Sequence, residues 1–599
     1  MNDFANFPPA ILLFLGALIV PFLKPAWRSF YVIALPLVAL LLILQLEEGQ
    51  SWQFSFLGFT SDPVEFLRVD KLSRAFGIIF SLNAFAAFLY AYYYKKRTHH
   101  VAALFYIGGA LGTVFAGDLL SLYVFWESMA VSSTFLILSR NTEAAKGAAF
   151  RYIMIHLVGG LLLLAGIILT IVQQEGSIAF NGFDFASQNH AGTWLILLGI
   201  LVNCGAPPLS AWLPDSYPSA SVTGGLILSA YTTKTAVYTL LRGYPGWDPL
   251  IYIGCAMAIY GVVYALMESD MRRILAFAII NQVGFMVCAA GIGNEEAING
   301  ATAAAFCHIL YKSLLWMVTG AVLYRVGKSN LSELGGMRHS MPVTTLFCCI
   351  GALSMAAPGT CGFTSKTMII HAAEYKKEFF AWIILELCSV GIFIAAALRM
   401  PYFLFFGKDR GIRVKEAPKT MIAAMSFLAF LCLLFGVYPQ PLYDLLPHGV
   451  DFNAYKLAHL TIVLQWLVFA GIAFAIFRKR LEPQAGRLVD FDWFYRKGSK
   501  SLYAAADRSL NAINAASARF FVGTIAKEVS HFFESGGARA ACVLMTPVWM
   551  MQGLNEEEIE DRRQAFFRQS KRGAFQIGIT AFFAVILLGM LSVIFLVER

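Results

Sequence analysis

Charged residues are scarce in this sequence: aspartate, glutamate, lysine and arginine make up 14% of its 599 residues, whereas 58% are hydrophobic. This composition excludes a soluble globular protein and indicates a polytopic membrane protein. The net charge of +9 does not indicate nucleic acid as a partner. The lysines and arginines fall mostly in short loops between apolar runs, where membrane topology explains them.

Patterns that would hold a cofactor or a metal are missing as well. The ten cysteines show no CxxC or Cys/His spacing, and most lie in apolar runs, as Cys348 and Cys349 do. They are interpreted as small core residues. Haem, iron–sulfur and nucleotide motifs are also missing, so we expect no cofactor and no metal, and assign any redox activity to partner subunits. Residues 11–22 lack a basic leader and a cleavage site, which favours a spanning helix over a signal peptide.

Apolar runs of bilayer length recur along the chain and are separated by short polar breaks. They predict an all-α integral membrane protein with about sixteen transmembrane helices. The expected helices lie near residues 9–23, 29–46, 71–94, 101–117, 119–139, 148–173, 192–213, 221–242, 248–267, 271–292, 298–326, 342–372, 380–406, 419–437, 456–477 and 573–596.

Basic residues cluster in alternate loops, which predicts the orientation. Loops after odd-numbered helices carry most of them, including residues 95–97, 272–273 and 408–415, and Lys376 and Lys377 are the main exception. We therefore expect the amino terminus outside a bacterial cytoplasmic membrane and residues 478–572 in the cytoplasm.

Residues 478–572 differ from the preceding chain because they are mixed and charged, with an amphipathic middle over 497–545. This pattern predicts an amphipathic helix along the membrane surface or along a neighbouring subunit, followed by a transmembrane anchor over 573–599. A cytoplasmic linker with helical propensity is the alternative.

The run 303–324 can cross a bilayer, yet it contains His308, Tyr311 and Lys312. Their spacing of i, i+3 and i+4 places all three on one side of a helix. A central lysine costs roughly 2.5–3.5 kcal/mol on insertion, so an intramembrane ionisable residue indicates function by default. We interpret this helix as part of a proton or cation path; an inert hydrogen-bonded cluster is the alternative.

Glu127 and Lys234 lie in the middle of two other apolar runs. Such groups on adjacent helices can form an ion pair that an arriving proton weakens. A permanent pair that only fixes helix packing is the alternative.

Two helices are expected to be interrupted. The segment 203–208 contains two consecutive prolines, and the segment 358–362 contains Pro358, Gly359 and Gly362. Interrupted spans are tolerated where they line protein or a wet cavity, and in transporters they mark the ion site. Lys366 follows the second break, and Glu386 on the next span is its potential partner. His156 and His371 are weaker candidates, interpreted as packing residues.

The two breaks occupy matching places in two blocks of five spans, which suggests inverted repeats. The expected segments are N-terminal helices 1–100, a first repeat 101–242, a second repeat 248–406, peripheral helices 407–477, a cytoplasmic segment 478–572 and an anchor 573–599.

Six ordered motifs carry a resemblance to a known family: DLLSLYVFWE (118–127), PLSAWLPDSYPSASV (208–222), TTKTAVY (232–238), ESDMRRILAFAIINQVGFM (268–286), HILYKSLLWMVTGAVLY (308–324) and APGTCGFTSK (357–366). Over roughly residues 65–475 the chain resembles the antiporter-like subunits of respiratory complex I, Mrp-type Na+/H+ antiporters and membrane-bound hydrogenases. The resemblance implies two inverted five-helix repeats with discontinuous helices around a hydrophilic axis. It also implies that Glu127 and Lys234 are the first-half acid and lysine, His308 and Lys312 connecting residues, and Lys366 the terminal lysine.

The sequence departs from the family pattern at two positions. Asn203 stands where the family usually has a lysine, and Tyr311 occupies the turn of a second family histidine. Because a neutral amide holds no proton charge, either Lys234 serves as the first-half centre or this half-channel is impaired. These changes point away from an orthodox complex I subunit and are compatible with a variant of the Mrp-like branch.

The sequence therefore predicts a membrane subunit of a multisubunit complex that moves protons, with Na+/H+ exchange as an option, along Glu127, Lys234, His308, Lys312 and Lys366. Glu386, Asn203 and Tyr311 are additional candidates. The expected partners are other membrane subunits and the lipid bilayer. The alternative is a proton-conducting partner of a cytoplasmic enzyme in an inorganic-carbon uptake, hydrogenase or dehydrogenase complex.

Overall fold

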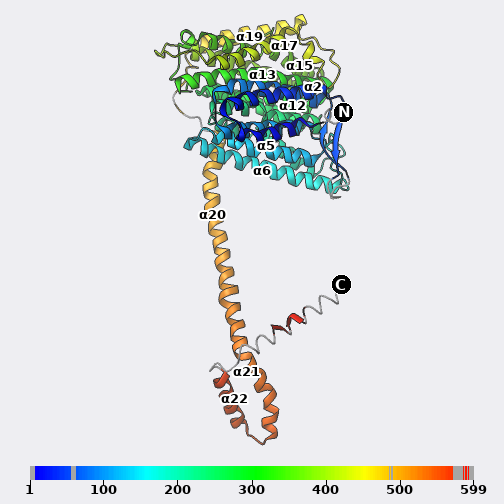
Figure 1. The fold of residues 1–599 in the computed structure, drawn as a ribbon, viewed down its shortest axis with the longest axis vertical. Coiled ribbons are helices and arrows are strands. Elements are labelled where there is room, and N and C mark those ends of the chain that lie inside the picture. Colours follow the sequence, from blue (N-terminus) through cyan, green and yellow to red (C-terminus); the bar gives the residue numbers. More distant parts are fainter. Residues whose placement is uncertain are drawn as a thin grey trace. The chain divides into compact units, whose positions relative to one another are not determined.

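The computed structural model describes residues 7–55, 62–484, 486, 490–570 and, in the last segment, 584, 585, 587–589 and 591 (Figure 1). The chain divides into two compact units, Met1–Trp493 and Phe494–Arg599. Each unit is described by itself.

Long apolar helices build the first unit. In the described part of the chain, ten are long and apolar enough to cross a membrane. They are α2 (Pro25–Gln45), α3 (Lys71–Tyr90, extended by η2, Ala91–Tyr93), α5 (Leu119–Leu138), α6 (Glu143–Gln173), α11 (Pro249–Met267), α12 (Met271–Ile292), α13 (Glu295–Val326), α16 (Phe379–Ile392, extended by the π-helical η4, Phe393–Arg399, and η5, Tyr402–Phe406), α17 (Lys419–Val437) and α19 (Leu457–Phe477).

Shorter or more polar helices complete this unit. They are α1 (Pro9–Ile19, followed by η1, Val20–Phe22), α4 (Arg97–Phe115), α7 (Ala191–Cys204), α8 (Trp212–Ser216), α9 (Val222–Ala230), α10 (Thr232–Gly243), η3 (Met337–His339), α14 (Pro342–Leu353), α15 (Cys361–Tyr375) and α18 (Gln440–Tyr443). The helical membrane fold is confirmed, whereas the count of sixteen spans stays a prediction.

The two interruptions expected from proline and glycine are present. Helix α7 ends at Cys204, and Gly205 caps it with a left-handed φ of 77°. Helix α14 ends at Leu353, and α15 begins only at Cys361. Both breaks expose backbone groups inside the bundle, where water or side chains must satisfy them.

A third break lies at Tyr231 and corrects the prediction of one continuous helix over 221–242. Helix α9 ends at Ala230, and α10 starts at Thr232. The Thr232 N–H donates to the hydroxyl of Tyr106 on α4 at 2.9 Å, and the Tyr231 hydroxyl donates to the Phe80 carbonyl of α3 at 3.0 Å. Because the Tyr106 hydroxyl of another helix accepts the freed Thr232 amide, the break needs neither proline nor glycine.

Helices α12 and α13 lie at the centre of the unit and are buried along almost their whole length, whereas α19 is mostly exposed. Figure 1 shows α12 and α13 enclosed by the surrounding helices. The polar side chains of α12 and α13 must therefore face protein or internal water. A short antiparallel hairpin, β1 (Ser51–Phe54) and β2 (Val64–Arg68), was not expected from the sequence and pairs Ser51 with Arg68.

Helices α11 and α12 approach each other closely through glycines. A Cβ added at Gly284 would lie 2.6 Å from the Gly254 carbonyl oxygen and 2.7 Å from the Ala258 amide nitrogen. These neighbours are backbone atoms, so a larger residue must separate the helices.

We expect Gly284→Leu to lower the free energy of unfolding by about 3 kcal/mol or more, because overpacking a close helix contact forces the backbone apart. The thermal unfolding midpoint of the purified protein measures the effect. Gly471→Leu is the matched control, since nothing lies within 4 Å of a Cβ at Gly471. Equal midpoints for both variants would contradict the proposed packing role.

The second unit is helical, as the amphipathic pattern predicts. Helix α20 (Asp492–Ala518) continues through the π-helical η6 (Arg519–Ile525) into α21 (Ala526–Met551), and α22 (Glu556–Ser570) packs against α21. Cys542, Trp549 and Ile559 are buried between these last two helices. The expected anchor over 573–596 falls, apart from a few positions, outside the described residues.

Candidate ion-translocation site

Helix α13 places His308, Tyr311 and Lys312 in the interior, and none is more than 3% exposed. The rings of His308 and Tyr311 are nearly perpendicular, with centroids 5.3 Å apart. In the described part of the chain, neither ring nitrogen of His308 nor Nζ of Lys312 has a hydrogen-bond partner. Buried polar groups without protein partners are costly, and internal water normally satisfies them. The centre of the bundle is therefore suited to hydration.

Lys234 lies in the first turn of α10, directly after the break at Tyr231, and not in the middle of a helix as predicted. Its ammonium donates to the carbonyl of Ser229 at 2.7 Å and to Oγ1 of Thr233 at 3.2 Å. The Ser229 carbonyl is available because α9 ends there. The break between α9 and α10 therefore supplies the carbonyl group that accepts a hydrogen bond from Lys234.

The C-terminal end of α10 is fixed by an ion pair outside the membrane-spanning segments. Arg242 donates to the carboxylate of Asp70, which precedes α3, and to the hydroxyl of Tyr238 at 2.8 Å. Burial raises the pKa of Asp70, but Arg242 and the Ser73 amide outweigh burial, so its pKa lies below its usual value. The pair therefore remains charged and holds α10 against α3.

Lys234, Lys312 and Lys366 are buried on helices that pack against one another, α10 against α13 and α13 against α15. Among the described residues, none of these three lysines has an acidic partner within 4.0 Å. A proton on one of them therefore disfavours a proton on the next.

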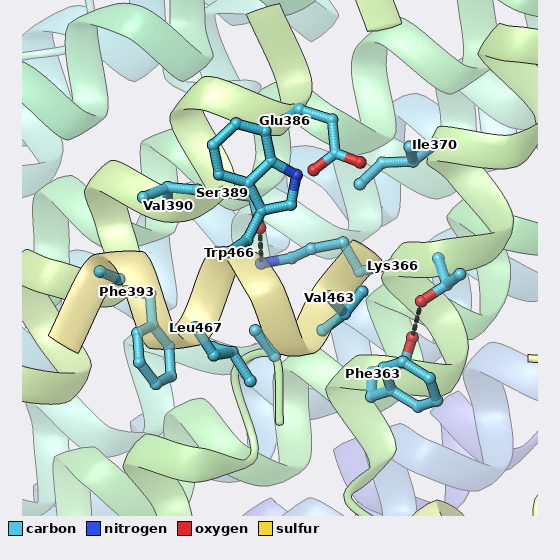
Figure 2. A pocket seen from close by; sticks show the side chains of 13 residues that line it. Phe363, Lys366, Ile370, Glu386, Ser389, Val390, Phe393, Val463, Trp466 and Leu467 are labelled. Carbon is cyan, nitrogen blue, oxygen red and sulfur yellow. Dashed lines mark hydrogen bonds between the residues drawn. The ribbon is translucent and has the colours of Figure 1, made fainter. Parts of the chain in front are cut away.

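Lys366 lies in the second turn of α15, after the break that separates α15 from α14. Its ammonium donates to Oγ of Ser389 at 3.3 Å and lies 5.3 Å from the ring centre of Phe285. Glu386 lines the same cavity, whose water-accessible volume is about 30 Å³. Figure 2 shows Lys366 reaching toward Ser389, with the Glu386 carboxylate and the Trp466 side chain at the same cavity. Lys366 and Glu386 therefore line one cavity but form no direct ion pair in the described structure.

Lys366 also lines a second, smaller cavity of about 10 Å³. It is lined by Gln282 of α12 and Tyr311 of α13, and the Tyr311 hydroxyl donates to Oε1 of Gln282 at 3.3 Å. A volume of this size holds about one water molecule. Lys366 thus lines both cavities.

Gln282 was not singled out from the sequence. Its side chain is 3% exposed. The Gln282 side-chain amide donates to Oδ1 of Asn281 at 2.9 Å. Asn281 donates through Nδ2 to the Ala258 carbonyl at 2.8 Å. Two adjacent polar amides, Asn281 and Gln282, stand within the apolar run 271–292. This pattern could have identified them as candidates.

Glu127 is not brought to Lys234. Its half-buried carboxylate lies against α6, where a Cβ added at Gly160 would be 2.0 Å from Oε1. Oε1 has no hydrogen-bond partner in the described part of the chain. The ion pair considered for these two residues is therefore not formed, and Glu127 faces the neighbouring helix instead.

Asn203, His156 and His371 lie on α7, α6 and α15, respectively. Asn203, at the end of α7, is 5% exposed, and its Oδ1 lacks a partner among the residues described. His156 bonds to the Tyr152 carbonyl at 2.9 Å and stacks on the Tyr152 ring, as expected for a packing residue. His371 contacts Glu296 at 2.6 Å near the end of α15.

These features define a polytopic membrane protein with broken helices and a buried row of ionisable side chains. Residues 116–395 match the family model described as "NADH:quinone oxidoreductase/Mrp antiporter, TM". Residues 116–395 are therefore similar to the transmembrane module of this family, and the resemblance found in the motifs is confirmed.

Curated relatives of two kinds match the chain. Hydrogenase-4 component B of Escherichia coli (strain K12) is 27% identical over 63% of this chain and 63% of its own length. An Na(+)/H(+) antiporter subunit of Alkalihalophilus pseudofirmus is 28% identical over 71% of this chain and 60% of its own length. The chain thus spans less than two thirds of each of these relatives.

Solved structures share the fold. A chain of the Mrp complex from Dietzia sp. DQ12-45-1b has a TM-score of 0.72 and 21% identity, over 86% of this chain and 62% of that one. A chain of the membrane-bound sulfane sulfur reductase, an archaeal respiratory membrane complex, has the same TM-score and identity over 90% of this chain and 99% of that one. The protein is therefore an integral membrane protein with this fold.

Proposed function

We propose that the protein is a proton-translocating subunit of a multisubunit membrane complex of the Mrp or complex I type. The observation that carries the proposal is the buried row Lys234, Lys312 and Lys366, with His308 beside it. Three buried amines, with no carboxylate within 4.0 Å of them in the described structure, cannot all remain protonated at low cost. Such a row supports stepwise transfer, in which each proton displaces the next.

The proposed steps run from α10 through α13 to α15, helices that pack against one another in this order. A proton held by Lys234 at the Ser229 carbonyl passes to His308 or Lys312 on α13 through internal water. From Lys312 it passes to Lys366, which shares a small cavity with Tyr311 and Gln282. Lys366 then exchanges with the cavity of Glu386. Protonation and hydration change in each step, and covalent chemistry is not required.

Glu127 and Asn203 belong to the first half of the proposed path. Glu127 lies apart from Lys234, so we assign it to proton entry between α5 and α6. Asn203 cannot carry a proton charge, and Lys234 therefore serves as the first-half centre. This assignment makes Lys234 the residue on which transport through the first half depends.

We further propose that the amino terminus lies outside and that residues 478–572 are cytoplasmic, in a bacterial cytoplasmic membrane. Basic loops that are distant in the sequence meet at one end of the helices. Lys95 donates to Ser29 at 2.8 Å, and Arg140 donates to the Pro218 carbonyl at 3.0 Å. Their gathering at one end agrees with the positive-inside rule.

A second candidate function is proton conduction for a redox enzyme. It is favoured by the match to hydrogenase-4 component B and by the fold shared with the sulfane sulfur reductase complex. In that case the driving force comes from partner subunits, because haem, iron–sulfur and nucleotide motifs are missing from this sequence. Na+/H+ exchange, as named for the antiporter relative, is the alternative source of driving force.

Purification from the native membrane, with mass-spectrometric identification of the co-purifying proteins, separates the two functions. Antiporter-type membrane subunits support the first, and iron–sulfur subunits support the second. Proton translocation itself is measured as acidification of inverted membrane vesicles from cells with and without this chain. Equal acidification in both vesicle preparations would contradict either function.

A further inference from the structure

A pocket of about 200 Å³ lies at one end of the first unit, away from the row of lysines. Two of its walls follow directly on membrane helices. Lys408 stands two residues after the end of η5, and Arg478 and Lys479 follow the end of α19. Both helices belong to long apolar spans, so the pocket lies where those spans reach the membrane surface.

The charges around this pocket are mostly of one sign. Lys408, Arg410, Arg478 and Lys479 line it, against the single carboxylate of Glu482. All four basic side chains are exposed, and Lys408, Arg478 and Lys479 have no acidic partner within 4.0 Å in the described structure. The pocket thus carries a net positive charge suited to an anion.

The inner wall is apolar and aromatic. Tyr402 and Phe403 line the pocket together with leucines of the segment 331–334. The guanidinium of Arg478 lies 5.6 Å from the ring centre of Tyr402. Next to the basic residues, Ile472 and Ile476 of α19 are 50% and 70% exposed. A ligand with an anionic head and apolar chains matches both surfaces.

The segment that carries Arg478 and Lys479 is bonded to the core. Arg399 of η4 donates through Nε to the Leu481 carbonyl at 2.8 Å. The Gln484 amide donates to Oγ of Ser269 at 3.1 Å. These contacts hold the wall of the pocket in place, so the pocket is a formed part of the fold.

We propose that this pocket binds the headgroup of an anionic phospholipid. The phosphate would contact the lysines and arginines, and the acyl chains would lie along the exposed apolar face of α19. The same helix covers the Lys366 cavity with Val463, Trp466 and Leu467 (Figure 2). A bound lipid therefore holds α19 against that cavity and limits its access to the bilayer.

The test is native mass spectrometry of the full protein, purified with its partners, after addition of phosphatidylglycerol or phosphatidylcholine. We expect the wild type to retain phosphatidylglycerol about tenfold more than the double variant Arg478→Gln/Lys479→Gln, because two phosphate-binding charges are removed. Retention of phosphatidylcholine should be low and unchanged in both. The charge-preserving variant Arg478→Lys should keep phosphatidylglycerol.

Lys415→Gln is the matched control, since Lys415 is an exposed lysine of the loop that carries Lys408 and does not line the pocket. If the first double variant does not fold, Lys408→Gln/Arg410→Gln tests the opposite wall. Equal retention of the two lipids, or unchanged phosphatidylglycerol in the folded double variant, overturns the proposal. Binding of inorganic phosphate by the wild type but not by the double variant, with equal retention of phosphatidylglycerol in both, also overturns it, because the pocket would then bind a free anion and not the lipid.

Discussion

Replacing Lys312 with methionine is expected to stabilise the protein and to stop proton transport at the same time. The Lys312 side chain is 1% exposed, and its ammonium has no hydrogen-bond acceptor among the residues described. Methionine is apolar and nearly as long, so it fills the same space without a buried charge. We expect the free energy of unfolding to rise by about 1–3 kcal/mol.

Transport should fall about 10²-fold or more in the same variant, because the transferring group is gone. The two readouts are the thermal unfolding midpoint of the purified protein and the acidification rate of inverted vesicles at equal protein amounts. A structural role for Lys312 predicts the opposite combination, namely loss of stability with transport reduced only in proportion to the folded protein. That combination would contradict its place in the path.

Replacing Lys366 with arginine is expected to abolish transport although the positive charge is kept. Arginine can replace the hydrogen bond to Ser389, but its guanidinium does not release a proton in proteins. The cavity beside Lys366 has room for about one or two water molecules, which eases the fit of the larger side chain. Transport should fall about 10²-fold.

The control for Lys366→Arg is Ser389→Ala, which removes only the hydroxyl acceptor of the lysine. We expect this variant to keep most of its transport, because the proton-carrying amine remains. If Lys366→Arg transports at the wild-type rate, Lys366 supplies a fixed charge and does not carry the proton.

The sequence predicted those features of the fold that depend on local chemistry. Two consecutive prolines and a Pro-Gly pair were sufficient to predict the breaks after α7 and α14. The break at Tyr231 could not be predicted, because the Tyr106 hydroxyl that accepts the freed Thr232 amide, and the Phe80 carbonyl that holds the Tyr231 hydroxyl, lie more than a hundred residues away. Tertiary partners of this kind leave no local signal.

The candidate site was predictable in its charged residues and not in its contacts. Lysine and histidine stand out in apolar runs because their insertion is costly. Gln282 is neutral and was overlooked, although it bonds to Tyr311. The separation of Glu127 from Lys234 depends on the close contact of α5 with Gly160 of α6. The cover of the Lys366 cavity comes from α19, far along the chain, which no motif indicated.

The central claim is that one path runs from the break at Tyr231 to Lys366, with Lys234 as its first-half centre. The most direct test is the acidification rate of inverted vesicles containing Lys234→Met, compared with Lys366→Met and with Lys415→Met as the exposed control. The account predicts that both buried variants lose transport about 10²-fold while Lys415→Met keeps it. Transport that persists in Lys234→Met and is lost in Lys366→Met would contradict a single path and show that the first half does not conduct.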